Sequence, residues 1–266
     1  MITINIDPMI FRAGHLMVRW YGLIVMAAIA AGVWVASREA KRKGLAEDYL
    51  GDAILWVLLA GILGARLFHV IDHWPDEFAG NPLRALYIWE GGLAIWGAVI
   101  GGLLALTIYA WQRGLRLAVL VDTIVPGLVL GQAIGRLACI ITGDAIGKPT
   151  AGPIGFRYLN PAAMVPQLDV YYVPTPVFEI IMNLAIFTVL WRLRTRRLPD
   201  GALFFVYLIL YSAGRFVVTF WSAYQTVALG LNQAQLISIA GFALGVPMLA
   251  YLLTQRRPRQ DVLAGH

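Results

Sequence analysis

The sequence predicts an all-α integral membrane protein of about seven transmembrane helices with a small extracytoplasmic head or lid. Hydrophobic residues make up 59% of the 266-residue chain and charged residues 14%, and the mean hydropathy is +0.71. Soluble domains contain about 45–50% apolar and about 25% charged residues, so this composition is typical of a membrane protein. No polar linker divides the chain, and we expect a single polytopic membrane domain over residues 1–266.

Seven apolar runs are each long enough to cross about 30 Å of hydrocarbon as a helix. Before the first run, residues 2–8 alternate between apolar and polar side chains, which predicts a short strand or a surface cap. In chain order the seven runs are Trp20–Ala36, Tyr49–Ile71, Leu93–Trp111, Val119–Ile141, Pro176–Trp191, Ala202–Trp221 and Leu236–Leu253.

The basic residues predict the orientation of these runs. Thirteen of the 21 Lys and Arg residues lie in the loops after the first, third and fifth runs and in the C-terminal tail. These segments share one side of an alternating path, and the positive-inside rule places that side in the cytoplasm. The N-terminus is then outside and the C-terminus inside. The net charge of +6 reflects this arrangement, and we expect no nucleic-acid partner.

The segment between the fourth and fifth runs, residues 142–175, is rich in Pro and Gly and has mixed polarity. It is too long for a tight turn, so we expect it to fold as an extracytoplasmic head or lid over the outer ends of the helices. Loops of this kind often carry a binding function.

Three arginines, Arg66, Arg136 and Arg215, lie inside the second, fourth and sixth runs. A charged side chain within the bilayer is costly and normally faces a protein interior or a wet cavity. Each arginine precedes the outer end of its run by about five to seven residues, which is about 7–10 Å at about 1.5 Å per residue. Cations at one depth on three helices indicate one shared site, and guanidinium groups suit phosphate. The alternative is that each arginine extends independently to the headgroups.

Other polar residues are expected near the same outer level. Glu90 and Glu179 are also candidates for a structural role as counter-charges, and Tyr21 for an interfacial aromatic residue. At the inner ends, we expect Asp52 and Asp122 to cap helices or pair locally. The polar residues at the outer level are Tyr21, Glu90, Asp144 and Glu179.

The stretch Gly131–Lys148 combines Arg136 with glycines at multiples of four residues, namely Gly131, Gly135, Gly143 and Gly147. On a continuous helix these glycines would line one face and allow close packing. Past Ile141, the run TGDAIG predicts a turn or kink. The sequence contains no metal-ligand cluster, P-loop or Ser-His-Asp arrangement, and we expect neither a metal nor a cofactor.

Six segments resemble motifs of the bacterial prolipoprotein diacylglyceryl transferase family, in the same order and over nearly the whole chain. They are RWYGL at Arg19–Leu23, LGARLFHV at Leu63–Val70, WEGGLAIWGAVIGG at Trp89–Gly102, GRLACIITGDAIG at Gly135–Gly147, PTPVFE at Pro174–Glu179 and GRF at Gly214–Phe216.

The resemblance implies that the protein transfers diacylglyceryl from phosphatidylglycerol to the lipobox cysteine of preprolipoproteins in the bacterial cytoplasmic membrane. Its partners would be phosphatidylglycerol, the signal peptides of preprolipoproteins and the surrounding bilayer. The catalytic residues implied are Arg136, Arg215 and Tyr21. The substrate-binding residues implied are Arg66, Glu90, Gly91, Gly92, Trp96, Asp144 and Glu179, together with Arg136.

The sequence departs from the family pattern at several polar positions. Trp96 and Val173 stand where the family has histidines, and Cys139 and Thr142 where it has asparagines. These departures leave a second hypothesis open, a catalytically attenuated or inactive paralogue that binds anionic phospholipid or lipoprotein precursors. A small-solute transporter is a third, although we find no repeat halves of the kind such folds use. The proton acceptor is also open between His69, Glu90 and the lipid phosphate.

Overall fold

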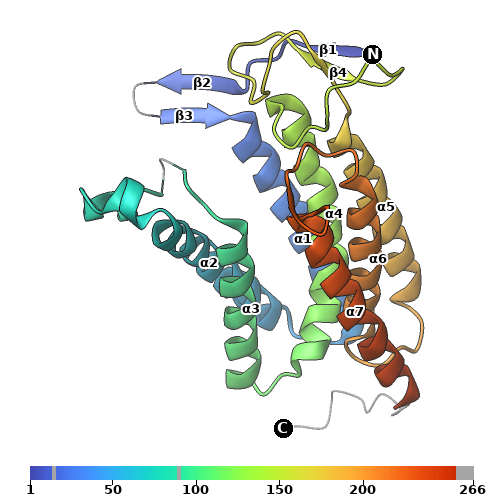
Figure 1. The fold of residues 1–266 in the computed structure, drawn as a ribbon. Coiled ribbons are helices and arrows are strands. Elements are labelled where there is room, and N and C mark those ends of the chain that lie inside the picture. The colour runs from blue at the N-terminus through green and yellow to red at the C-terminus, as the bar shows by residue number, and fades with distance from the viewer. Residues whose placement is uncertain (14–15, 89–90, 256–266) are drawn as a thin grey trace. The chain divides into compact units, whose positions relative to one another are not determined.

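The computed structural model describes residues 1–13, 16–88 and 91–255, and it divides the chain into two compact units (Figure 1). The main unit consists of Met1–Ala36 and Val121–His266, and the α2–α3 unit consists of Ser37–Leu120. Each unit is described by itself.

The main unit is a helix bundle with three small sheets. Helices α4, α5, α6 and α7 run side by side (Figure 1). The helices are α1 (Trp20–Lys43, whose last turns belong to the α2–α3 unit), α4 (Leu117–Thr142), α5 (Thr175–Leu193), α6 (Ala202–Val218) and α7 (Gln233–Thr254). The strands are β1 (Ile2–Ile4), β2 (Met9–Ala13), β3 (Leu16–Arg19), β4 (Phe156–Tyr158), β5 (Tyr171–Tyr172), β6 (Thr226–Ala228) and β7 (Leu231–Asn232).

An apolar core joins α4, α5 and α6. Its buried side chains come from all three helices: Val125, Val129, Ile186, Leu190, Leu203 and Tyr207. At one end of this core, the carboxylate of Asp122 accepts hydrogen bonds from the backbone N–H groups of Gly201 (2.8 Å) and Phe204 (2.9 Å). Asp122 thereby satisfies donors at the start of α6, which helices otherwise leave unpaired. The local capping role expected for Asp122 is confirmed.

Glycine allows α1 to approach α4 closely. A Cβ atom on Gly32 would lie 3.0 Å from the carbonyl oxygen of Gly127, and one on Gly131 would lie 3.2 Å from that of Ala28. The turn predicted past Ile141 is confirmed: α4 ends at Thr142, so Gly143 and Gly147 do not continue the helix face of Gly131 and Gly135. Gly143 instead has a φ of +77°, a left-handed conformation that suits glycine, and begins the predicted turn.

The head is a three-stranded sheet of order β1-β4-β5, in which β1 pairs parallel and β5 antiparallel with β4. It packs around Ile4, Ile146, Phe156, Tyr158 and Tyr172, so the N-terminal residues and the segment after α4 build one small core. The buried Tyr158 hydroxyl donates to the carbonyl of Ile140 in α4, at 2.8 Å. Burial raises the pKa of this tyrosine, with the charge of Asp144 as a smaller cause, so the donor proton is retained at neutral pH. The strand predicted at residues 2–8 is confirmed as β1.

The α2–α3 unit pairs two long antiparallel helices joined by two short helical turns. A Cβ atom on Gly64 would lie 3.2 Å from the carbonyl carbon of Gly97, so the helix backbones meet closely there. At the far end, Arg113 donates to Asp52 at 3.1 Å, which confirms the local pairing expected for Asp52. The helical elements are α2 (Glu47–Asp72), a π-helical turn (Trp74–Phe78), a 3₁₀ turn (Pro82–Leu86) and α3 (Ile95–Gln112).

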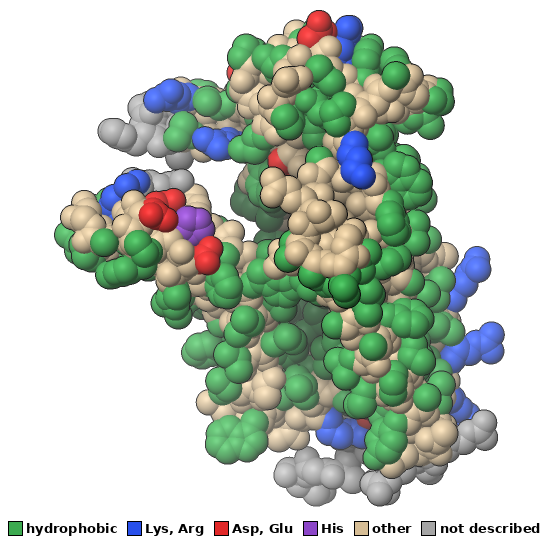
Figure 2. Space-filling model, in the orientation of Figure 1, with side chains coloured by type: hydrophobic (Ala, Val, Ile, Leu, Met, Phe, Trp, Pro, Cys, Tyr) green, Lys and Arg blue, Asp and Glu red, His purple; other side chains and the backbone are tan. Residues whose placement is uncertain are grey.

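The described residues contain seven long helices at the seven predicted positions. Six of them are long and apolar enough to cross a membrane, and α6 is a shorter apolar helix of 17 residues, about the lower limit for a span. Hydrophobic side chains cover much of the outer surface of the helices (Figure 2). On α5 and α7 these include Ile181, Leu184, Phe242 and Leu244, all exposed. Such surfaces fit a lipid environment, and the predicted multi-pass membrane fold is confirmed.

Candidate functional site

Three helices of the main unit bring an ionic cluster together near the head. Arg136 lies in the last two turns of α4, Glu179 in the first two turns of α5, and Arg215 in the last turn of α6. The Nε atom of Arg136 pairs with one carboxylate oxygen of Glu179, and the Nη1 atom of Arg215 pairs with the other. We call these residues the arginine–glutamate cluster. Glu179 thus acts as a counter-charge to both arginines, one of the two roles expected for it.

The exposure of the three side chains shows which of them faces outward. The Glu179 side chain is 3% exposed, whereas those of Arg215 and Arg136 are 14% and 25% exposed. Two cations and one anion leave the cluster with a formal charge of +1. A buried carboxylate therefore holds two guanidinium groups together, and their more open sides carry a net positive charge.

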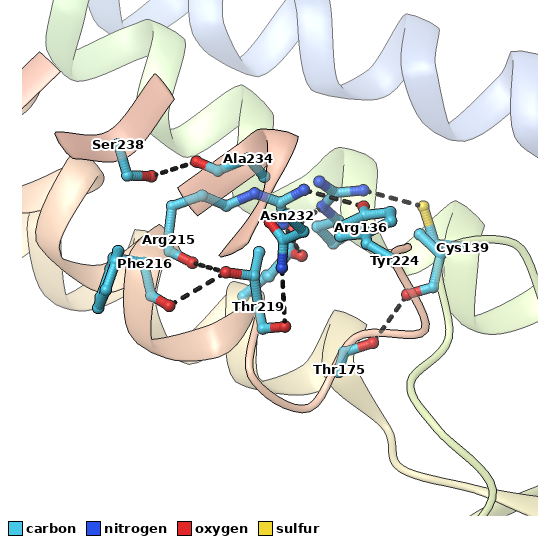
Figure 3. Close-up of polar contacts among 12 residues, drawn as sticks. Arg136, Cys139, Thr175, Arg215, Phe216, Thr219, Tyr224, Asn232, Ala234 and Ser238 are labelled. Carbon is cyan, nitrogen blue, oxygen red and sulfur yellow. Dashed lines mark hydrogen bonds and ion pairs between the residues drawn. The ribbon is translucent and has the colours of Figure 1, made fainter. Parts of the chain in front are cut away.

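Arg215 also contacts the segment between α6 and α7. Its Nη2 atom donates to the hydroxyl of Tyr224 at 3.0 Å, and Figure 3 shows Tyr224 in the same close group as Arg136 and Arg215. Thr219 caps the preceding turn by donating to the carbonyl of Arg215 at 2.9 Å. The side-chain amide of Asn232 then donates to the carbonyl of Thr219 at 3.5 Å. The segment that follows Arg215 is therefore tied back to the end of α6.

Arg136 has a different set of neighbours on the side of α4 that leads to the head. Its Nη1 atom lies 3.6 Å from the sulfur of Cys139, one turn further along the helix (Figure 3). Asp144, on the turn after α4, accepts from the Thr142 hydroxyl and lies within hydrogen-bonding reach of the Cys139 thiol. Tyr21, in the first turn of α1, is close enough to Arg136 and Asp144 for their charges to act on its hydroxyl. The structure thus brings together Tyr21, Arg136, Asp144, Glu179 and Arg215.

Arg66, in the α2–α3 unit, is held by backbone carbonyl groups. Its Nε donates to Ala85 (2.9 Å), its Nη2 to Arg84 (2.6 Å), and its Nη1 to Gly91 (2.7 Å) and Gly92 (3.2 Å). Every nitrogen of this buried guanidinium group therefore has a carbonyl partner. These contacts fasten the loop before α3 to α2. The substrate-binding role expected for Arg66 stays a prediction.

The remaining predicted residues of this unit lie around the same loop. Gly91 and Gly92 have φ values of +94° and +69°, and a Cβ on Gly92 would press on the ring of His69 and on Arg66. His69 lies 3.5 Å from the carboxylate of Glu77 and 4.3 Å, between ring centroids, from His73. Trp96 is partly exposed in the first turn of α3. Glu90 lies outside the described residues.

Sequence reasoning missed two contributors to the main-unit site. Tyr224 lies in an irregular segment, so no periodic pattern connects it with Arg215. Cys139, which the sequence marks only as a departure from the family pattern, is buried and contacts Arg136. A usable signal existed for Cys139, because its spacing of three residues from Arg136 places both on one face of α4.

The arrangement is suited to binding an anion. Guanidinium groups present planar, permanently charged donors that match phosphate oxygens. Among the described residues, no group of three or more His, Cys, Asp or Glu side chains converges to hold a metal ion.

Comparison with known proteins gives matches over nearly the full chain. Residues 8–251 match the family described as prolipoprotein diacylglyceryl transferase. A protein from a Nostoc species, named phosphatidylglycerol–prolipoprotein diacylglyceryl transferase, is 37% identical over 264 residues, covering 96% of this chain and 93% of the relative. A protein of the same name from Dehalococcoides mccartyi is 36% identical, covering 98% and 100%. Another from Lysinibacillus sphaericus is 32% identical, covering 99% and 98%.

Proposed function

Since this chain belongs to the prolipoprotein diacylglyceryl transferase family, we propose that it transfers diacylglyceryl from phosphatidylglycerol to the cysteine thiol of a preprolipoprotein. The substrates are then an anionic phospholipid of the membrane and the signal peptide that carries the acceptor cysteine. The reaction needs no cofactor, because the phosphoglycerol headgroup is itself the leaving group.

The observation that carries this proposal is the bridging of Arg136 and Arg215 by Glu179. The phosphodiester of phosphatidylglycerol carries one negative charge, and the arginine–glutamate cluster carries a formal charge of +1. Two guanidinium groups held at one carboxylate have a restricted separation, so less freedom is lost when they bind the phosphate. Preorganised donors of this kind stabilise charge without reorganising during the reaction.

In the proposed reaction, the cysteine sulfur attacks the glycerol carbon that carries the phosphate ester. A carbon–sulfur thioether bond forms, the bond between that carbon and the phosphate oxygen breaks, and glycerol phosphate leaves with the electron pair. Negative charge grows on the phosphate as this bond breaks, and Arg136 and Arg215 stabilise it. Interactions that strengthen in this way lower the barrier and do not merely tighten binding.

The thiol proton must also be accepted, because the thiolate is the reactive form and a free cysteine has a pKa of about 8.5. We assign the proton to the phosphate oxygen that is released, which becomes more basic as the ester bond breaks. The second pKa of a phosphate monoester is about 6, so the product then loses this proton to water at neutral pH. We assign to Tyr21 a hydrogen bond that its hydroxyl donates to the lipid or to the incoming thiol.

The orientation proposed from the basic loops puts the N-terminus and the head outside the cytoplasm and the C-terminus inside. This places the arginine–glutamate cluster near the outer leaflet of the bacterial cytoplasmic membrane, where residues 142–175 would cover it. Labelling of single-cysteine variants tests the orientation. Residues 39–46 should react with a membrane-impermeant reagent only after cells are opened, and their labelling on intact cells would contradict it.

The function is tested by in vitro transfer with purified protein, phosphatidylglycerol vesicles and a lipobox peptide. The expected result is a thioether-linked diacylglyceryl peptide and released glycerol phosphate in equal amounts. Arg136→Gln is the negative control, and Arg113→Gln, at the exposed pair with Asp52, is the matched control expected to retain activity.

A binding-only function is the second candidate, because Trp96 and Val173 replace histidines of the family pattern. Well-folded wild-type protein that binds phosphatidylglycerol vesicles but yields no thioether product would favour it over the transferase.

A further inference from the structure

One buried polar atom of the main unit has no use in the proposed reaction. Asn183, in the middle of α5, is 2% exposed, and among the described residues no group donates a hydrogen bond to its side-chain oxygen Oδ1. Buried polar atoms nearly always have a partner, and an orphan calls for a specific explanation such as an ordered water. The residues near Asn183 on α5 indicate what its partner is.

Asn183 is one helical turn from the arginine–glutamate cluster. Glu179 and Asn183 are four residues apart, and both belong to the buried face of α5. Residues spaced this way have Cβ atoms about 5–6 Å apart on one helix face. The side chain of Asn183 therefore follows that of Glu179 on the same buried face, one turn further along α5.

The neighbouring helices also place polar groups one turn inward from the arginines. Tyr211, four residues before Arg215 on α6, packs against the core and lies close enough to Glu179 to interact with its charge. Gln132, four residues before Arg136 on α4, donates to the Tyr207 hydroxyl at 2.9 Å. We call Gln132, Asn183, Tyr207 and Tyr211 the inner polar layer.

We infer that the inner polar layer holds an ordered water that donates to Asn183 Oδ1 and to the carboxylate of Glu179. A buried water needs two to four polar partners, and Asn183, Glu179 and the Tyr211 hydroxyl supply three. Two hydrogen bonds of about 2.8 Å through one water span the separation expected between groups one turn apart. Water suits these partners because it can donate to both the amide oxygen of Asn183 and the carboxylate of Glu179.

The water makes Asn183 a positioning residue for the proposed reaction. Each oxygen of Glu179 already pairs with one arginine, and a further donor from the inner side restrains rotation of the carboxylate. That restraint fixes the separation of Arg136 and Arg215 before the phosphate arrives. This consequence rests on the proposed function, whereas the water site itself does not.

The direct test is an experimental structure of the full chain in lipid at a resolution that shows ordered water. The expected result is a solvent peak about 2.8–3.0 Å from Asn183 Oδ1 and within hydrogen-bonding distance of Glu179. The peak should persist in Arg136→Gln and disappear in Asn183→Val. A dry space filled by apolar side chains beside Oδ1 in the wild type would overturn the inference.

The functional test compares Asn183→Val with Asn183→Thr, two variants of nearly the same shape, of which only threonine can hold the water. We expect kcat to fall about tenfold in Asn183→Val, by analogy with groups that orient metal ligands, while KM for phosphatidylglycerol changes little. Asn183→Thr should stay within about threefold of the wild type. Ile186→Val, one turn further along the same face, controls for loss of packing and should leave kcat unchanged.

The outcomes separate the two proposals. Equal losses in the valine and threonine variants would show that shape, and not hydrogen bonding, matters at position 183, which overturns the positioning role. Absence of transfer by the wild type would overturn the proposed function alone, because the solvent peak and its loss in Asn183→Val are measured without turnover.

Discussion

Arg136 and Arg215 in the main unit and Arg66 in the α2–α3 unit are the same residue type at a similar expected depth, yet they are held in opposite ways. The carboxylate of Glu179 bridges the first two and leaves the cluster with a net positive charge. The nitrogens of Arg66 donate to four backbone carbonyls of the loop before α3. In one arrangement a carboxylate joins two guanidinium groups, and in the other a single guanidinium group holds a loop by its backbone carbonyls.

The difference indicates that burial of an arginine does not by itself predict its role. Its partners also matter: a charged side chain sets the position of the guanidinium group, whereas backbone acceptors occupy its donors. Substitutions that preserve charge but change the number and direction of the donors separate these two roles.

The largest effect is expected from Arg136→Lys and Arg215→Lys. Lysine keeps the charge but lacks the planar pair of donors that match a phosphate. Loss of one preorganised donor costs about 2.7–4 kcal/mol of transition-state stabilisation, so kcat should fall about 10²–10³-fold. The measurement is the transfer rate, with Arg113→Lys as control. Near-normal rates in Arg136→Lys would contradict a bidentate phosphate role.

The second effect is on stability and arises at Glu179. In Glu179→Gln the two arginines lose their shared counter-charge, and removing one member of a buried ionic group costs about 3–5 kcal/mol. Because Arg136 and Arg215 are partly exposed to solvent, we expect the lower end of this range, a loss of about 3 kcal/mol in the free energy of unfolding.

Thermal unfolding in detergent measures this loss, and phosphatidylglycerol should restore part of it by supplying the missing negative charge. Glu77→Gln, at the exposed pair with His69, is the matched control and should change the melting temperature little. An unchanged melting temperature in Glu179→Gln would show that the arginines do not depend on this carboxylate.

A smaller and local effect is expected at Arg66. In Arg66→Lys a single ammonium group replaces three nitrogens that reach four carbonyls, so some carbonyls are left without a donor. Each buried unsatisfied acceptor costs about 1–3 kcal/mol. Hydrogen exchange should accelerate in peptides covering Pro82–Ile88 and remain unchanged there in Arg136→Lys. Loss of lipid binding without faster exchange would favour the substrate-binding role for Arg66.

The smallest effect is expected at Trp96. Tryptophan offers one N–H donor and no acceptor, so it cannot serve as a base. If Arg136, Arg215 and the leaving phosphate suffice for catalysis, the wild type and Trp96→His should both rescue a transferase-depleted strain. Their transfer rates should then lie within about tenfold of each other. A gain of about 10²–10⁴-fold in Trp96→His, the usual worth of a general base, would show instead that a histidine is needed.

Much of the fold could be predicted because it depends on local composition. Seven apolar runs gave seven helices, and the alternation at residues 2–8 gave β1. A local capping or pairing role for Asp122 also followed from its position near the inner end of a run, but its partners on α6 did not. The predicted helix ends were off by a few residues; α1, for example, continues through the basic residues to Lys43, because a helix can extend beyond the apolar segment.

Other features could not be predicted because they depend on residues far apart in the chain. Tyr224 reaches Arg215 from an irregular segment, and β1 pairs with β4 from a distant part of the chain. Neither contact produces a periodic pattern in the sequence.

The sequence by itself determined the membrane fold and the family, because hydropathy and motif order can be read directly along the chain. Only the tertiary structure decided which partners each arginine has, by placing one carboxylate of α5 between α4 and α6 and four backbone carbonyls around Arg66. The reason is physical: a guanidinium group is the same in every sequence, and its role depends on which acceptors the fold brings within hydrogen-bonding distance.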